Sequence, residues 1–346
     1  MIIGDLDIVV GEYKARISYL ENIGSATAPK YEWRRGDADP FDGMAFGDEM
    51  NPALADLDGD GDFDLAVGDK AGLIKYYENV GSALLPQFVG RTGSANPFEG
   101  VAVDKYCAPR FVDIDGDGDL DLVTGEAKGG LTVYENKASS AVAPVTVEIA
   151  AAASPLGLVD VDIHASSAAY SAPTLVDFDG DNDLDVIVGH EMVYDLNGDD
   201  QASIAEYEAG ASALTFFFYE NIGSSVAPEF VQKTGSDPFA FVDAYMTSAA
   251  TFGDLDQDGD LDMIVGDGQG LIMYYENVGL TAEGYVARQG FANPTNPWLK
   301  IPIQGEALSF NLALGDLDGD GAAPRCLSRD PDRATNVAPS QATSIW

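Results

Sequence analysis

The chain has 346 residues, 46% of them hydrophobic, which allows one large domain or two ordinary ones with a substantial core. Its 58 acidic residues against 18 lysines and arginines give a formal net charge of −40, and a surface this negative repels phosphate backbones and anionic lipids, so we expect no nucleic-acid partner. No apolar run is long enough to cross a bilayer, so we expect no membrane span.

The chain opens inside a repeated unit. Residues 4–11 read Gly-Asp-Leu-Asp-Ile-Val-Val-Gly, which is the second half of a motif that recurs further along. The first residues have no basic region followed by a long apolar core, so no secretory signal peptide is visible.

The first complete copy of the motif runs from Asp56 to Asp64, with aspartate at its positions 1, 3, 5, 7 and 9. A second landmark, Tyr-Tyr-Glu-Asn, follows at residues 76–79. Alternation of apolar and polar residues, together with turn residues, predicts four short strands in this unit. They are Pro52–Ala55, Asp64–Gly68, Leu73–Tyr77 and a strand near Gln87–Val89.

Both landmarks recur in the same order along the chain. Further complete Asp-rich copies begin at Asp113, Asp177 and Asp254, and an incomplete copy begins at Asp316. The Tyr-Glu-Asn landmark ends at Asn22, Asn79, Asn136, Asn221 and Asn277. We interpret its aromatic residues as packing between neighbouring repeat units, and its Glu and Asn as the start of a turn.

Four antiparallel strands in a unit of roughly 60 residues match the size of a β-propeller blade. A linear β-solenoid is the alternative, but its rungs are usually shorter. The sequence therefore predicts an all-β fold, a β-propeller of four-stranded antiparallel blades with about five blades visible.

The alternating aspartates favour a bound metal ion. Carboxylates packed this closely repel one another, and a hard divalent cation reverses the sign of that interaction. Calcium accepts about six to eight oxygen ligands in forgiving geometry, whereas magnesium prefers a tight octahedron with retained waters. Position 6 of the loops holds Gly61, Gly118, Asn182 or Gly259, which suits a sharp turn with positive φ. We predict calcium in the four complete loops; the alternative is a solvated acidic turn without metal.

These loops resemble the FG-GAP/VCBS repeats, whose calcium-binding blades are related to those of the integrin α-subunit propeller. The resemblance covers residues 4–321, although the Phe-Gly-Gly-Ala-Pro string that names the family is missing. It implies that the side chains at positions 1, 3, 5 and 9 and the carbonyl of position 7 hold the metal. The implied ligands are Asp56, Asp58, Asp60, Asp62, Asp64, Asp113, Asp115, Asp117, Asp119, Asp121, Asp177, Asp179, Asp181, Asp183, Asp185, Asp254, Asp256, Asp258, Asp260 and Asp262.

The unit that follows the third complete loop is the longest and carries a different acidic motif. Residues 195–206 resemble an EF-hand loop, which needs acids or Asn at positions 1, 3 and 5 and a bidentate Glu at position 12. Asp200 replaces the usual glycine, and Ala202 stands where a larger apolar residue is usual. This segment is either a further calcium site or a decorated acidic loop. The ligands of the site would be Asp195, Asn197, Asp199 and Glu206.

The two ends of the repeat region are complementary. The chain closes with the first half of a motif at residues 316–321, and a strand near Asn311–Leu314 precedes it. Pairing this strand with the N-terminal strands would complete a fifth blade and close the ring. It would also assemble a split metal site from Asp316, Asp318, Asp320, Asp5 and Asp7. The alternative is a piece of a larger propeller of about six to eight blades.

The predicted domain organisation is one propeller over residues 1–321 and a tail over residues 322–346. The tail abandons the repeat pattern, so we expect it to be disordered or aberrant.

Catalytic signals are weak. Only His164 and His190 are present, which leaves little material for a histidine-based metal centre or a Ser-His triad. Most paired carboxylates fall in the metal loops, so we expect no enzyme activity.

Three function classes remain open. We favour an adhesion or recognition module that binds a protein or glycan on the propeller face. The alternatives are a structural part of a larger surface assembly and a propeller domain of a carbohydrate-active enzyme. Because acid-rich loops fill readily at the millimolar calcium found outside cells, we expect an extracellular or cell-surface location.

Overall fold

The computed structural model describes most of the repeat region. The described residues are 6–12, 16–25, 29–137, 146–149, 154–157, 159, 170–190, 216–233, 238–239, 242, 248–267, 272–278, 285–287 and 311–318. Apart from two 3₁₀ turns, Gly36–Ala38 and Gly93–Ala95, their regular structure consists of β-strands. Within these ranges, no helix has the length and hydropathy needed to cross a membrane.

Twenty strands form five antiparallel sheets of four strands each within the described residues. Blade 1 consists of β20 (Asn311–Gly315), β1 (Asp7–Glu12), β2 (Arg16–Asn22) and β3 (Tyr31–Trp33). Blade 2 consists of β4 (Asn51–Ala55), β5 (Asp64–Gly68), β6 (Ile74–Asn79) and β7 (Phe88–Arg91). Blade 3 consists of β8 (Ala108–Val112), β9 (Asp121–Gly125), β10 (Leu131–Asn136) and β11 (Thr146–Ile149). Blade 4 consists of β12 (Ser171–Val176), β13 (Asp185–His190), β14 (Phe216–Asn221) and β15 (Phe230–Gln232). Blade 5 consists of β16 (Ser248–Gly253), β17 (Asp262–Asp267), β18 (Ile272–Asn277) and β19 (Tyr285–Ala287).

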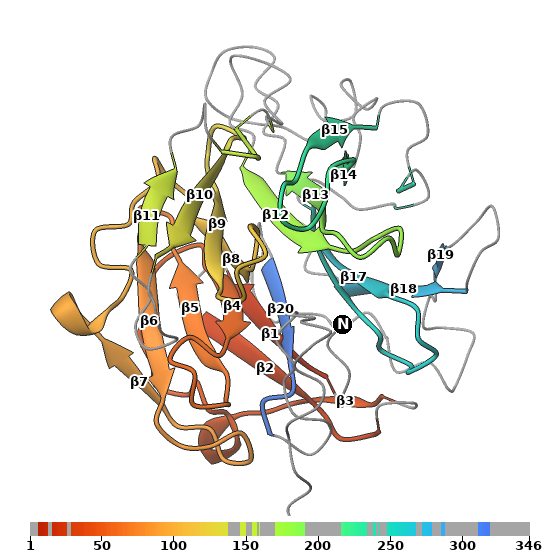
Figure 1. The fold of residues 1–346 in the computed structure, drawn as a ribbon. Helices are drawn as coiled ribbons and strands as arrows, with labels where there is room; N and C mark the ends of the chain where they lie inside the picture. The colour runs from red at the N-terminus through yellow and green to blue at the C-terminus, as the bar shows by residue number, and fades with distance from the viewer. Residues whose placement is uncertain are drawn as a thin grey trace, which may run out of the picture.

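The first strands of the blades form a closed inner ring. Each of β4, β8, β12, β16 and β20 contacts the first strand of the blade before it and of the blade after it. The other strands of each blade follow outwards in order, so that the fourth strand is the outer edge (Figure 1). The predicted all-β propeller is therefore confirmed, with five blades.

Blade 1 is assembled from both ends of the described chain. Its first strand, β20, pairs antiparallel with β1, with Leu314 opposite Ile8 and Leu312 opposite Val10. The predicted joining of the two ends is confirmed, and it closes the ring at five blades.

The hydrophobic core lies between neighbouring blades rather than inside any one sheet. Between blades 1 and 2, for example, Val9 and Tyr19 pack with Leu65 and Val67 in one buried cluster. Burying an apolar side chain of this size contributes about 1.5–3 kcal/mol. Alternate residues of each strand therefore face opposite neighbours, and both faces of a blade are apolar.

Glycines allow the blades to approach closely at one level. A Cβ atom on Gly11, Gly68 or Gly125 would lie 2.0–2.2 Å from a backbone carbonyl oxygen of the next blade. These glycines end or nearly end the second strand of their blades. No larger side chain fits there without moving the neighbouring inner strand.

Candidate metal centres

The Asp-rich loops join the first and second strands of each blade. In blade 2, Asp56 at position 1 accepts hydrogen bonds from the amides of Gly59 (2.8 Å) and Gly61 (3.2 Å). In blades 3 and 4, Asp113 and Asp177 accept the corresponding pair of bonds. The side chain at position 1 therefore wraps the loop around itself.

Position 6 adopts the backbone conformation that its residue types predicted. The φ angle is +99° at Gly61, +95° at Gly118, +74° at Asn182 and +98° at Gly259. Glycine adopts positive φ at little cost, and asparagine is among the next most tolerant residues.

The aspartate at position 9 is the most buried acid of each loop. Asp64 has 1% of its surface exposed, and its Oδ1 accepts a hydrogen bond from the Asn79 amide at 2.7 Å. Its Oδ2 accepts a hydrogen bond from the amide of Leu57 at position 2 of the loop (3.1 Å). This carboxylate thus ties the loop to the Tyr-Glu-Asn landmark at the end of the third strand.

The other blades repeat this arrangement. The landmark amides of Asn22, Asn136, Asn221 and Asn277 donate to position 9 at 2.7–2.9 Å. The amides at position 2 donate to the second carboxylate oxygen at 3.0–3.1 Å in all five blades. The sequence reasoning assigned position 9 to the metal alone and missed this structural role.

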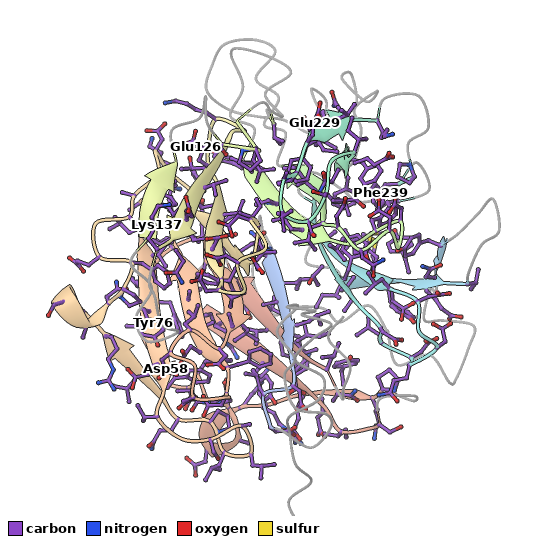
Figure 2. The ribbon with its side chains drawn as sticks, viewed as in Figure 1. Asp58, Tyr76, Glu126, Lys137, Glu229 and Phe239 are labelled. Carbon is purple, nitrogen blue, oxygen red and sulfur yellow. The ribbon has the colours of Figure 1, made fainter. Side chains whose placement is uncertain are left out.

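A tyrosine hydroxyl supports position 9 in three blades. Tyr76 donates to Asp64 at 2.9 Å, and Tyr19 donates to Asp7 at 2.8 Å. Tyr274 also hydrogen-bonds to Asp262. The landmark carries Val133 and Phe218 at this place in blades 3 and 4, so those blades lack the hydroxyl. Figure 2 labels Tyr76 and, on the same blade, Asp58.

The roles of the Asn and Glu of the landmark were predicted only in part. The Asn side chain does start a turn, because Oδ1 of Asn79 accepts from the amides of Gly81 and Gln87. The Glu has a different role: Glu78 forms an ion pair with Arg91 of the outer strand. Blades 1 and 4 repeat the ion pair as Glu21–Arg34 and Glu220–Lys233.

Carboxylate oxygens converge in every loop. In each of five groups, one oxygen per aspartate lies within 4.8 Å of the others. The groups are Asp56, Asp58 and Asp60; Asp113, Asp115 and Asp121; Asp177, Asp179 and Asp181; Asp254, Asp256 and Asp262; and Asp7, Asp316 and Asp318.

The fifth group contains three of the five residues of the predicted split site. Asp316 and Asp318 follow β20, and Asp7 begins β1 at the position-9 place. The amide of Leu317 donates to Oδ2 of Asp7 at 3.0 Å, as the position-2 amide does in the continuous loops. The other two predicted members, Asp5 and Asp320, lie outside the described residues.

Burial raises the pKa of several loop acids. The pKa of Asp7 is raised to about 8, and those of Asp64, Asp121, Asp185 and Asp262 to about 7, with burial the largest cause in each. At position 7, burial and then repulsion from the loop acids raise the pKa of Asp62, Asp119 and Asp183 to about 6. Without a cation, burial therefore makes the charged form of these acids costly, although hydrogen-bond donors at position 9 partly offset that cost.

A further observation indicates that the loop aspartates fit a hard cation. Oδ1 of Asp254, which belongs to a converging group, is buried without a hydrogen-bond partner among the described residues. The same holds for Oδ1 at position 7 in Asp62, Asp119 and Asp183, where the resemblance implies the carbonyl as the ligand. A buried carboxylate oxygen without a partner costs free energy that a metal ion would recover. An all-oxygen donor set of this kind suits calcium.

The EF-hand-like motif remains a prediction. Asp195, Asn197, Asp199 and Glu206 lie outside the described residues, as do His164 and the tail from residue 322 onward.

The opposite end of the inner strands carries a second unusual cluster. Glu49, Tyr106 and Tyr170 each precede an inner strand by one or two residues, and each has a positive φ, of +53°, +55° and +23°. All three stand seven residues before the first aspartate of their loop. Positive φ in residues as bulky as tyrosine is an outlier of the kind that concentrates at functional sites.

Side-chain contacts join these residues across three blades. The Tyr106 and Tyr170 rings have centroids 4.0 Å apart. Lys70 lies 5.2 Å from the centroid of the Tyr106 ring and forms a 2.7 Å ion pair with Glu49. Lys70 belongs to the turn between β5 and β6, at the end of the blade opposite the metal loop. We call Glu49, Lys70, Tyr106 and Tyr170 the tyrosine cluster.

Comparison with known proteins supports the repeat assignment. Residues 113–188, which include the loops of blades 3 and 4, match the family described as FG-GAP-like repeat. Among curated proteins, none has a significantly similar sequence.

One similar solved structure is an Agrocybe aegerita lectin described by its specific recognition of non-reducing terminal N-acetylglucosamine. It is 15% identical, covers 81% of this chain and 75% of its own, and has a TM-score of 0.40. A likeness at this score carries no functional argument.

Proposed function

Because residues 113–188 are an FG-GAP-like repeat within a five-bladed β-propeller, we propose that this protein is a calcium-stabilised, non-catalytic recognition module that works outside cells. Calcium in the loops would supply charge neutralisation and crosslinking, not chemistry. The residues that would hold it are the loop aspartates, with those at positions 1 and 3, and that at position 5 or 9, contributing converging oxygens.

The acid-rich loops support the proposed extracellular setting. Their acids have raised pKa values and orphaned buried oxygens, so filling them with a divalent ion stabilises the folded chain by mass action. Millimolar calcium outside cells would keep such loops filled, whereas the cytosol offers far less.

The tyrosine cluster is the observation that carries the recognition role. A strained backbone conformation costs of order 1–3 kcal/mol for each residue and persists only where neighbouring contacts hold it in place. Such residues are common at ligand-binding sites. Tyrosine offers a broad apolar ring and a polar hydroxyl at low conformational cost, the combination that recognition surfaces favour. The cluster lies on the face opposite the metal loops, so a ligand there would not compete with calcium.

Binding assays on the purified, calcium-loaded protein test this proposal. We expect hits on a glycan array or a panel of extracellular proteins, and Tyr106→Ser and Tyr170→Ser should each weaken a hit by about tenfold or more. The matched control is Leu84→Ser, an exposed residue of the β6–β7 turn on the metal-loop face. Equal binding by all three variants would contradict the assignment of the tyrosine cluster.

A further inference from the structure

Two residues of the tyrosine cluster come from neighbouring blades and meet ring to ring. Tyr106 precedes the inner strand β8 of blade 3, and Tyr170 precedes the inner strand β12 of blade 4. These two strands contact each other in the inner ring (Figure 1). The centroids of the tyrosine rings are 4.0 Å apart, and the ring planes are tilted by 47°. Aromatic pairs usually keep their centroids about 4.5–7 Å apart, so this pair is unusually close.

A difference between two equivalent turns explains why these rings meet. Lys70 of blade 2 and Ala127 of blade 3 occupy the same place, two residues after the glycine that ends the second strand. The Lys70 side chain contacts both Glu49 and Tyr106, so it lies between those two members of the cluster. Ala127 is buried and carries only a methyl group, which lets the Tyr106 and Tyr170 rings come into contact.

Hydrogen bonds between blades hold both tyrosines in position. The amide of Tyr106 donates to the carbonyl of Lys70 at 3.3 Å, and the Lys70 side chain also hydrogen-bonds to the Tyr106 side chain. The amide of Ser171, which follows Tyr170, donates to the carbonyl of Glu126 in blade 3 at 3.1 Å. The contact between the rings is therefore part of the junction between blades 3 and 4.

Tyrosines that are adjacent in the sequence lack this arrangement. Tyr76 and Tyr77 follow one another on β6, but their side chains point to opposite faces of the blade. They lie in different buried clusters, with 4% and 8% of their surface exposed. Tyr106 and Tyr170 are only half-buried, so this pair combines ring contact with access from solvent.

This combination suits the oxidative coupling of two phenols. Loss of one electron and one proton from a phenol leaves a radical whose unpaired electron is shared with the ring carbons ortho to the oxygen. Two such radicals in contact form one carbon–carbon bond between ortho carbons. The two ortho hydrogens then leave as protons, and both oxygens regain a proton, so the product keeps two hydroxyl groups. The two electrons and two protons lost overall reduce one hydrogen peroxide to two waters.

We propose that Tyr106 and Tyr170 are a modification site, at which a peroxidase and hydrogen peroxide join blades 3 and 4 through a dityrosine bond. The close ring contact favours coupling within one molecule over coupling between two, because the partner ring is already in place. The bond would make covalent a blade junction that hydrogen bonds and packing otherwise hold.

Oxidation of the dilute, calcium-loaded protein by a peroxidase and hydrogen peroxide tests the site. We expect the monomer to lose two hydrogen atoms in its intact mass and to gain dityrosine fluorescence. Proteolysis should then release a crosslinked peptide pair that contains Tyr106 and Tyr170. Tyr106→Phe and Tyr170→Phe keep the ring but remove the phenol, so each should lose this product. The matched control Tyr31→Phe removes a half-buried tyrosine of blade 1 and should retain it.

Three results would overturn the proposal: no crosslinked pair of these two tyrosines in the wild type, crosslinks that join only separate molecules, or an equal yield of the product in the two phenylalanine variants. If those variants fail to fold, the wild type decides alone, because unfolding in urea before oxidation should abolish the product. A yield that urea leaves unchanged would show that the folded contact does not direct the coupling. No ligand takes part, so the outcome is independent of the recognition assays.

Discussion

The aspartate at position 9 of each loop has two roles at the scale of single residues. In Asp64 one carboxylate oxygen accepts from the Asn79 amide, and the other accepts from the Leu57 amide and the Tyr76 hydroxyl. All these partners are donors, so the site is built for a carboxylate even before a metal is considered. Position 5 differs, because Asp60 is exposed and accepts only from the amide of Asp62.

This difference predicts that substitutions at positions 9 and 5 depend differently on calcium. Asp64→Asn should lower the free energy of unfolding by about 1–3 kcal/mol both with calcium and without it, because its amide must face buried donors. Asp60→Asn should be destabilising only with calcium. Urea unfolding of both variants in calcium and in metal-free buffer measures this. A loss for Asp64→Asn that vanishes without metal would show that position 9 serves the metal alone.

The raised pKa values predict how pH acts on the metal-free protein. The ordinary aspartate pKa is 3.8, whereas Asp7 titrates at about 8 and Asp64 at about 7 in the folded chain. The folded state therefore holds more protons than the unfolded state between these values, and the stability that these groups contribute falls as pH rises from about 4 to about 8. Calcium competes with those protons, so its stabilisation should grow over the same range.

Melting curves at pH 5 to 8 in metal-free buffer and in millimolar calcium test this linkage. We expect the Tm without metal to fall as pH rises, and the difference between the two conditions to widen. A difference that stays constant with pH would mean that the buried acids are not the ones that bind calcium.

At the scale of elements, replacing a glycine by alanine should cost more stability where another strand lies close to it than where the space around it is open. Gly68→Ala brings a Cβ atom to 2.2 Å from the Cys107 carbonyl oxygen, so β5 and β8 must separate. At Gly61, a Cβ atom meets nothing within 4 Å, and only its φ of +99° opposes alanine. We expect a loss of about 1–2 kcal/mol for Gly61→Ala and a larger loss for Gly68→Ala by chemical denaturation. An equal loss would contradict the close approach of the blades.

The sequence predicted the elements well where the repeat was periodic. The second strand of blade 2 was predicted with its observed ends, and the loops, the turn at position 6 and the pairing of the chain ends are all found. The third strand was expected at Leu73–Tyr77 but is Ile74–Asn79, since Asp64 holds the Asn79 amide at its end. A sequence pattern does not show that bond.

Other features could not be predicted from the sequence. The ion pair of Glu78 and Arg91 joins residues on neighbouring strands, and its recurrence in blades 1 and 4 becomes visible only once the strands are aligned. Positive φ at Tyr106 and Tyr170 contradicts the preference of tyrosine, so composition argues against it.

At the scale of the whole molecule, ring closure should dominate stability. Without β20, blade 1 loses its inner strand, and Leu312 and Leu314 leave the cluster that joins blades 5 and 1. We expect a variant ending at residue 310 to lose cooperative unfolding or most of its Tm, measured by calorimetry in calcium. The matched variant ending at residue 321 keeps β20 and should retain the Tm. Similar melting of the two would show that the ring does not depend on this strand.

Closure by residues so far apart also bears on synthesis at the ribosome. The partner for the inner edge of β1 is β20, which follows roughly 300 residues later along the chain, a delay of about 15–60 s at ordinary translation rates. Until then its backbone donors and acceptors form an open edge that another nascent chain could join. Blade 1 therefore keeps an aggregation-prone open edge until β20 has been synthesised.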